Sequence, residues 1–505
     1  MTNDNYVLTN DNYDRKNHPH KGEQTVIKKS RGVSVKKKQT RKWACLVAAC
    51  FFMFCSTNQK VIQNSVKNNG AKGDGIHDDT QAIQAALDKN ETVYLPKGTY
   101  LVSHLIVRDN RNIKTDGFET LLKQKSNQAA VAPLDIDKTI IVVLGSNVVI
   151  DKLSCEGNIN AYEGEQNHAV LLLPTTKNIQ NVHLKGLNIK NVRGDAVCIG
   201  NTRFFCENIV VENLTAQNIY RNGVSITSGR GIQLTNIDVQ QSGMDGIDIE
   251  GEGTPEMPLE NLTITNAFIG NLCVTGITQK AKNINVKQLH IDGQRKGSSP
   301  PYKPMNPAGI IVSETENAVF DDVLIENLPE FAILSGDVEK KESHLSKNIT
   351  FNNLTVRTSS LNEKRYNAYI CVMGFTDVTF NNLNANVEKD KALFLGKPLT
   401  FKGTQQVNLN KATVKGGQHL AKNCHLLGKE MTVNTEGVCL SGMTETSVIE
   451  NSEITCLRMT EKTETSDNTK IPMAYNIKKG NFKSAKFDLK NSRVIEKEEI
   501  KTQKD

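Results

Sequence analysis

Four polar residues recur along the middle of the chain at a spacing that could bring their side chains together. They are His168, Asp195, Asn222 and Asp245; the first three are 27 residues apart, and the last follows 23 residues later. Each opens a short segment in which a small residue precedes alternating apolar and variable positions. If these segments stack in register, the four side chains form one polar column, in which His168 is a candidate proton carrier.

Carboxylates gather at one end of this column. Asp248 and Glu250 face the same side of one predicted strand, with Cα atoms about 6–7 Å apart, and Asp195 lies roughly 10 Å from Asp245, two repeats away. Hydrolysis of a glycosidic bond uses two flanking carboxyl groups, whereas a lyase needs a base and neutralises a uronate. Arg221 could neutralise that uronate or act as the lyase base. We therefore predict catalytic residues Asp195, Asp245, Asp248 and His168, and substrate-binding residues Arg221, Asn222 and Glu250.

The same pattern has two other interpretations. An Asp or Asn before a glycine at a turn often serves only to accept hydrogen bonds from backbone amides. Stacked oxygen ligands from Asp195, Asn222 and Asp245 could instead hold Ca²⁺, which is the one candidate cofactor that the sequence offers.

The elements that must position these residues are stacked coils. Self-similarity at a period of 20–50 residues is typical of a solenoid, whose neighbouring coils bury one continuous core. Alternation along a strand predicts one inward set, Val197, Ile199, Ile247 and Ile249, and one outward set, Cys198, Ser225, Asp248 and Glu250. A row of small residues beside the column predicts the floor of a groove for an extended ligand, formed by Ala169, Ala196, Gly223 and Gly246.

Asparagine marks the expected coil turns. It recurs before an apolar alternation at Asn147, Asn181, Asn208, Asn261, Asn283, Asn348 and Asn353. Asparagine tolerates left-handed backbone geometry and can form hydrogen bonds along a stack. Four Asn-x-Thr triplets, at Asn213, Asn261, Asn348 and Asn353, also match glycosylation acceptors, but we interpret them as coil turns.

The first 60 residues carry the basic charge of the chain. They hold 12 Lys and Arg against four acids, or +8, which leaves −1 of the net +7 for the remainder and gives no support for nucleic-acid binding. The uncharged run Trp43–Cys55 is shorter than the ~20 residues of a membrane span and suits an export signal, and Val47–Cys50 resembles a lipoprotein cleavage box. We predict a disordered leader at 1–42, a signal, lipoprotein or anchor segment at 43–56, a β-helix at 60–460 and a polar tail at 461–505.

Glycines at Gly70, Gly73 and Gly75 predict a tight turn, after which Asp78 or Asp79 would cap a helix that buries Ile83, Ala86 and Leu87. This stretch, GAKGDGIHDDTQAIQAAL, followed by VYLPKGTYLV, resembles the N-terminal signature of the pectate-lyase-like superfamily. The resemblance covers roughly residues 62–460 and implies an all-β, single-stranded right-handed parallel β-helix (a solenoid) with a short N-terminal capping helix. Members include polysaccharide lyases, glycoside hydrolases, alginate-type epimerases and phage depolymerases.

The strand Met244–Ile249 resembles the catalytic strand of polygalacturonase-type hydrolases, which implies that Asp245 is a catalytic acid. The next coil, Asn271–Gly276, lacks the Asp-Asp pair of those enzymes, and their Gly-His-Gly and Arg-Ile-Lys are absent from the chain. The Asp-Pro-His-Glu of the epimerases is absent as well.

We predict an exported or membrane-anchored polysaccharide-cleaving enzyme, a lyase or a glycoside hydrolase, that acts on an acidic or complex glycan. Its partner is the polysaccharide, with no nucleic acid and with membrane contact only through the N-terminal segment. The alternatives are a non-catalytic carbohydrate-binding or cell-surface structural β-helix and a uronate C5-epimerase. An enzyme should bring Asp195, Asp245 and Arg221 to one open cleft, whereas a structural protein should bury them against backbone.

Overall fold

A computed structural model describes residues 64–496, except for 126–137, 161–164, 202, 252, 271–275, 294–307, 328–330, 336–345, 358–367, 374–376, 387–391, 397–405, 416–420, 423–424, 435–437, 442–447, 457, 461–487 and 491–492. The described residues belong to one compact unit, Gln59–Asp505. The predicted leader 1–42 and the predicted signal or anchor segment 43–56 lie outside them. A helix with the length and apolarity of a membrane span is not found in this described part.

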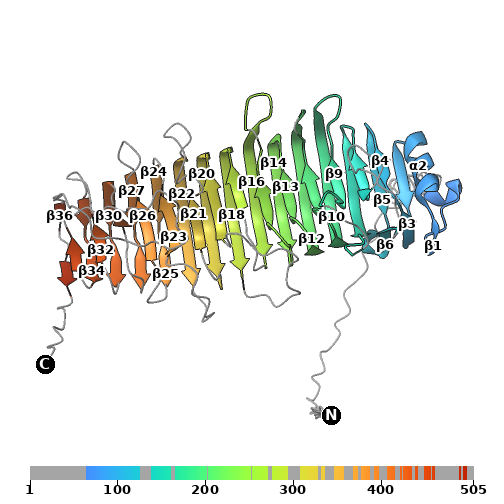
Figure 1. Ribbon diagram of the computed structural model, residues 1–505. Coiled ribbons are helices and arrows are strands. Elements are labelled where there is room, and N and C mark those ends of the chain that lie inside the picture. The colour runs from blue at the N-terminus through green and yellow to red at the C-terminus, as the bar shows by residue number, and fades with distance from the viewer. Residues whose placement is uncertain are drawn as a thin grey trace, which may run out of the picture. The chain divides into compact units, whose positions relative to one another are not determined.

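Strands make up nearly all of the structure and pair in parallel within three sheets (Figure 1). The largest sheet holds β1 (Asp74–Asp78), β2 (Thr92–Leu95), β3 (Gly98–Val102), β5 (Arg111–Thr115), β6 (Thr120–Gln124), β8 (Val148–Glu156), β10 (Ile179–Val192), β12 (Cys206–Ile219), β14 (Gly229–Val239), β16 (Leu259–Ile269), β18 (Lys282–Asp292), β20 (Glu316–Glu326), β22 (Lys347–Arg357), β24 (Asp377–Asn381), β25 (Asn384–Asn386), β27 (Gln406–Asn410), β28 (Thr413–Lys415), β30 (His425–Lys429), β31 (Thr432–Asn434), β33 (Val448–Glu450), β34 (Glu453–Cys456), β36 (Asp488–Lys490) and β37 (Arg493–Glu496).

Two further sheets consist of short strands. The six-stranded sheet holds β4 (Leu105–Val107), β7 (Ile141–Val143), β9 (Val170–Leu172), β11 (Val197–Ile199), β13 (Val224–Ile226) and β15 (Ile247–Ile249). The eight-stranded sheet holds β17 (Gly276–Gln279), β19 (Ala308–Ser313), β21 (Phe331–Ser335), β23 (Ala368–Met373), β26 (Ala392–Gly396), β29 (Ala421–Lys422), β32 (Val438–Ser441) and β35 (Arg458–Thr460).

The register of these sheets confirms the predicted solenoid. β10 pairs with β12 from Ile179↔Cys206 to Val192↔Ile219, which is a shift of one 27-residue repeat. The coils from β10 to β22 each contribute one long strand to the largest sheet, whereas later coils contribute two short ones, such as β24 and β25. Parallel crossovers of this kind are right-handed. The protein is an all-β, right-handed parallel β-helix. Figure 1 shows the strands of successive coils lying side by side.

The N-terminal end carries the predicted capping helix, α2 (Thr80–Lys89), preceded by the 3-10 helix η1 (Val66–Asn69). Asp79 occupies the N-cap position, but its carboxylate accepts the backbone N–H groups of Lys72 (2.6 Å) and Gly73 (2.9 Å) in the glycine-rich turn. Asp78 Oδ1 accepts the N–H of Thr80 (3.1 Å) instead. Asp79 therefore stabilises the glycine-rich turn, and Asp78 caps the first N–H group of the helix.

Asparagines bend the long strands. Those predicted to mark turns adopt left-handed φ angles, for example 56° at Asn181 and 53° at Asn208. The ladder also continues through their side chains, because Asn181 Nδ2 donates to Asn147 Oδ1 (3.0 Å) and Asn208 Nδ2 to Asn181 Oδ1 (3.4 Å). The four Asn-x-Thr asparagines have positive φ as well, so they are coil turns as predicted.

One continuous core fills the coils. The predicted inward residues Val197, Ile199, Ile247 and Ile249 belong to it, and so do the free thiols Cys155 and Cys206. Further along, Phe320, Phe351 and Phe380 stack face to face with ring centroids 4.8 and 5.1 Å apart. A second, smaller 3-10 turn, η2 (Gly117–Glu119), lies at the surface.

Two predictions need correction. The row of small residues does not line a groove, because Ala169 and Ala196 are fully buried in the core and a Cβ on Gly223 would lie 2.4 Å from Val239 Cγ2. These residues are small because they face packed side chains. The polar tail predicted from residue 461 contains β36 and β37, which pair with β33 and β34 and continue the ladder to Glu496.

Candidate functional site

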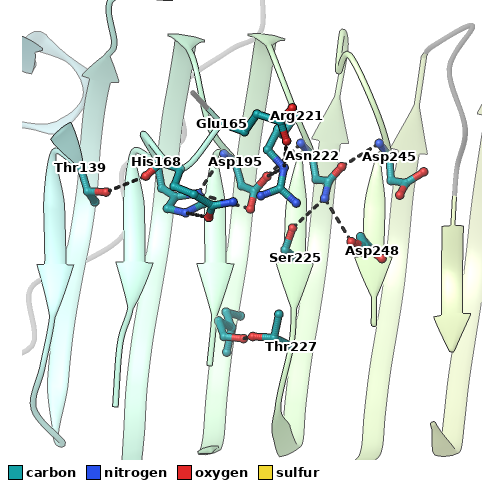
Figure 2. Close-up of polar contacts among 12 residues, drawn as sticks. Thr139, Glu165, His168, Asp195, Arg221, Asn222, Ser225, Thr227, Asp245 and Asp248 are labelled. Atoms are coloured by element: carbon teal, nitrogen blue, oxygen red, sulfur yellow. Dashed lines mark hydrogen bonds and ion pairs between the residues drawn. The ribbon is translucent and has the colours of Figure 1, made fainter. Parts of the chain in front are cut away.

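The four residues of the polar column lie in successive coils, each two residues before a strand of the six-stranded sheet (Figure 2). Each side chain accepts the backbone N–H of the next member. Asp195 N–H donates to His168 Nδ1 (3.0 Å), Asn222 N–H to Asp195 Oδ1 (3.1 Å) and Asp245 N–H to Asn222 Oδ1 (2.8 Å). The column is therefore one chain of side chain–backbone hydrogen bonds across four coils.

His168 is 2% exposed and has both ring nitrogens engaged. Since a backbone N–H can only donate, Nδ1 accepts from Asp195, and Nε2 carries the proton toward Gln166 Oε1 at 3.1 Å. Nδ1 also lies 3.3 Å from Asp195 Oδ2. An ion pair there would require a proton on Nδ1, and Nδ1 could then no longer accept the hydrogen bond from the Asp195 backbone N–H. The neutral ring satisfies more donors. The predicted role of His168 in proton transfer stays a prediction.

Asp195 is 1% exposed and ionised. Burial alone would raise the pKa of this carboxyl group, but the Arg221 guanidinium and the Asn222 N–H lower it. Arg221 Nε lies 3.6 Å from Asp195 Oδ1 and 4.0 Å from Glu165 Oε2, and its side chain is 19% exposed. A buried carboxylate thus holds a guanidinium at the surface of the coil.

Asp248 stands apart from the column and is only partly buried. Asn222 Nδ2 donates to its Oδ2 (3.1 Å) and to Ser225 Oγ (2.9 Å). Burial raises the pKa of Asp248 well above its usual range, and the carboxylates of Asp245 and Glu250 raise it further. A carboxyl group in this environment stays protonated where ordinary aspartates are ionised.

Asp245 and Glu250 complete this end of the site. Asp245 is partly exposed and Glu250 is exposed, in contrast to the buried His168, Asp195 and Asn222. The structure therefore brings the predicted residues together as two groups. Three are enclosed and bonded to backbone, while Asp245, Asp248, Glu250 and Arg221 reach the surface.

The middle residues of the short strands form one row. The sequence analysis predicted that three of them, Cys198, Ser225 and Asp248, point outward, but it did not predict that Cys198 and Ser225 are buried. In-register pairing aligns Ile106, Val142, Leu171, Cys198, Ser225 and Asp248. Cys198 is 8% exposed and packs with Val142 and Leu171 in a second apolar cluster outside the core. The row changes from apolar to polar at Ser225, just where Asp248 follows.

Glu165 is a site residue that the sequence analysis missed. It lies three residues before His168, and the acidic stretch Glu163–Glu165 ahead of that coil was the available signal. The alternation of side chains along the strand correctly assigned Ser225 to the outward face. It could not predict the hydrogen bond from Asn222 Nδ2 to Ser225 Oγ, which depends on side-chain conformation.

A metal fits poorly here. Within the described residues, one nitrogen of His168, one oxygen of Asp195 and the sulfur of Cys198 lie within 4.8 Å of one another. Calcium prefers oxygen ligands. The side-chain oxygens of Asp195 and Asn222 that the sequence suggested as ligands already accept backbone N–H groups. The Arg221 guanidinium, which would repel a cation, also lies 3.6 Å from Asp195 Oδ1. We therefore assign no step to a metal.

Comparison with known proteins finds one family model that matches the N-terminal part of the described β-helix. Residues 63–299 match the family described as "Rhamnogalacturonase A/epimerase, pectate lyase-like". This region is a pectate lyase-like β-helix, as the sequence predicted.

Individual relatives are more distant. The chain is 27% identical over 271 residues to plasmin and fibronectin-binding protein A of Streptococcus pneumoniae, covering 45% of this chain and 36% of that protein. It is 24% identical over 289 residues to an exopolygalacturonase of Arabidopsis thaliana, covering 52% of this chain and 61% of that one. The matches thus span from about a third to three fifths of these relatives. A mannuronan C-5 epimerase A-module of Azotobacter vinelandii has a solved structure with a TM-score of 0.38 and 15% identity, covering 86% of this chain and all of that one.

Proposed function

We propose that this protein is an extracytoplasmic polysaccharide-cleaving enzyme, a glycoside hydrolase, with its chemistry at the surface end of the polar column. The observation that carries the proposal is the environment of Asp248, whose pKa is raised by burial and by Asp245 and Glu250. The relation to pectate lyase-like proteins, one relative being an exopolygalacturonase, supports a polysaccharide as the substrate.

Asp248 would act as the general acid. A carboxyl group whose raised pKa keeps it protonated where ordinary aspartates are ionised can donate its proton to the glycosidic oxygen as the bond to the sugar breaks. Asn222 Nδ2 at 3.1 Å fixes one oxygen of Asp248, which orients the carboxyl group. Asp245, close enough to raise the pKa of Asp248, would be the second carboxyl group and act as the base. It would take a proton from a water molecule whose oxygen bonds to the anomeric carbon as the glycosidic bond breaks.

Arg221 would bind the substrate. Its guanidinium is partly exposed and is held by Asp195 and Glu165, so it is fixed without being fully enclosed. A fixed guanidinium recognises carboxylates and hydroxyl groups by paired hydrogen bonds, which favours an acidic glycan. In this scheme His168, Asp195 and Asn222 are positioning residues.

The test is an assay of the full-length chain against a panel of acidic and neutral polysaccharides. Reducing ends would be followed together with the ultraviolet absorbance of unsaturated products. We expect reducing ends without absorbance, a rate that falls as pH rises through the raised pKa of Asp248, and a loss of about 10²–10⁴-fold in kcat for Asp248→Asn.

Asp321→Asn is the matched control, since Asp321 faces outward on β20, pairing with Asn352 in the next coil. It should leave the rate unchanged. Absorbance that rises with reducing ends would identify a lyase, and altered uronate composition without new ends would identify an epimerase. An unchanged rate in Asp248→Asn would refute the assignment of the acid.

A second candidate function is glycan or protein binding without catalysis at the cell surface. It is favoured by the burial of His168, Asp195 and Asn222 against backbone amides, and by a relative named for plasmin and fibronectin binding. Binding of a polymer with no product of any kind would support this alternative over the hydrolase.

A further inference from the structure

A cleft lies on the outer face of the largest sheet, where β14 and β16 are neighbours. It has a volume of about 510 Å³ and is lined by Asn236, Ile237, Asp238, Gln240, Asn266 and Phe268. Asp248 and Arg221 belong to coil segments of the six-stranded sheet and do not line it. The cleft is therefore a feature that the proposed hydrolytic site does not use.

The register aligns side chains of the cleft with those of the next coil. Asp238 pairs with Phe268, and Phe268 with His290, so the three side chains stand in one outward row on adjacent strands. Pairing in this register continues to Val239↔Ile269, which places Gly270 opposite Gln240.

Asp238 has an unmet hydrogen-bonding capacity. Its Oδ2 accepts from Gln240 Nε2 at 2.8 Å, whereas its Oδ1 is buried and has no hydrogen-bond partner within the described residues. A carboxylate oxygen removed from water without a donor is costly, so a donor group from a ligand would relieve that cost. The carboxylate is the only charged group among the lining residues.

Phe268 supplies the apolar side of the cleft. Its ring meets the His290 ring edge to face, with centroids 5.0 Å apart and planes inclined by 74°. His290 is itself fixed, because its Nε2 lies 2.9 Å from Glu326 Oε1. The Phe268 ring is thus held in place by its neighbour in the next coil while it lines the cleft.

We infer that this cleft is a second carbohydrate site, which binds a neutral hexopyranose unit. A sugar ring presents C–H groups that pack on an aromatic ring and hydroxyl groups that donate to a carboxylate, and the cleft offers one of each. The negative charge of Asp238 disfavours uronates and sulfated sugars. The site would hold a neutral portion of a polymer apart from the segment being cleaved.

The test measures binding of hexaoses by calorimetry to the full-length chain carrying Asp248→Asn, so that no probe is consumed. The probes are cellohexaose, maltohexaose and galactohexaose, with hexagalacturonate as the charged comparison. We expect at least one neutral hexaose to bind, and Phe268→Ala to weaken it by about tenfold or more. Asp238→Asn should weaken binding of the neutral hexaose and strengthen binding of hexagalacturonate.

Two controls keep the result specific. Val319→Ala removes another exposed apolar side chain, 37% exposed on β20, and should leave binding unchanged. Phe268→Tyr keeps the ring and should restore binding if Phe268→Ala is poorly folded. The inference is overturned if no neutral hexaose binds, or if Phe268→Ala melts normally and binds as tightly as its parent. Loss of hydrolysis in Asp248→Asn bears on the proposed function alone.

Discussion

The polar column beside the six-stranded sheet and the asparagine ladder on the largest sheet both repeat once per coil, yet their side chains bond to different partners. In the ladder, exposed amides bond to one another, as Asn208 does to Asn181. In the column, enclosed side chains accept backbone N–H groups of the next coil, as Asp195 does from Asn222. An exposed bond competes with water, whereas a buried N–H that loses its acceptor has no substitute, so the same repeat should contribute very differently to stability.

The sharpest way to break this comparison is to remove a buried acceptor. Asp195→Ala leaves the Asn222 N–H unsatisfied and the Arg221 guanidinium without its buried partner. We expect a loss of about 3–5 kcal/mol in the free energy of unfolding, measured by urea denaturation. Asp195→Asn keeps an acceptor oxygen and should lose less. A loss below about 1 kcal/mol for the alanine variant would place the column on a par with the ladder.

The ladder should respond to backbone conformation more than to its hydrogen bonds. Asn208 has a φ of 53°, and its counterpart in the next coil is Gly231 with a φ of 64°. Asn208→Gly should therefore be almost neutral, whereas Asn208→Ala should lose about 1–2 kcal/mol because alanine disfavours left-handed geometry. Equal losses in the two variants would show that the side-chain bond to Asn181 matters more than we infer.

Asp248, beside the exposed end of the column, should show the smallest effect on stability and a pH dependence opposite to that of Asp195. Because the folded-state pKa of Asp248 is raised, its contribution to stability is full at low pH and is lost as pH rises through that pKa. Asp195, with a lowered pKa, stabilises at higher pH and loses its contribution as pH falls. Asp248→Asn should flatten the fall in melting temperature with rising pH, and Asp195→Asn should not.

Much of this organisation could be predicted from the sequence. The spacing from His168 to Asp195 to Asn222 gave the register of the coils, and the asparagines gave the positions of their bends. Both follow from local rules, namely the period of the repeat and the tolerance of asparagine for positive φ.

What surrounds each side chain could not be predicted in this way. Alternation assigned Cys198 and Ser225 to the outer face, but it does not reveal that other parts of the molecule enclose that face. Nor does it show that Gly223 is small because Val239 packs against it, rather than because a ligand approaches. Burial arises from contacts between coils distant in sequence, which no single strand encodes.

The constant step of 27 residues between β9, β11 and β13 has an evolutionary consequence. An insertion or deletion of one whole repeat moves every later residue by a full coil and leaves its neighbours chemically equivalent, so the array can change length by recombination without losing its pairing. A change of one residue within a coil shifts the register and turns side chains to the opposite face. Related chains of this type should therefore differ in length by whole coils, and the 23-residue step from Asn222 to Asp245 is a coil four residues shorter than the two before it.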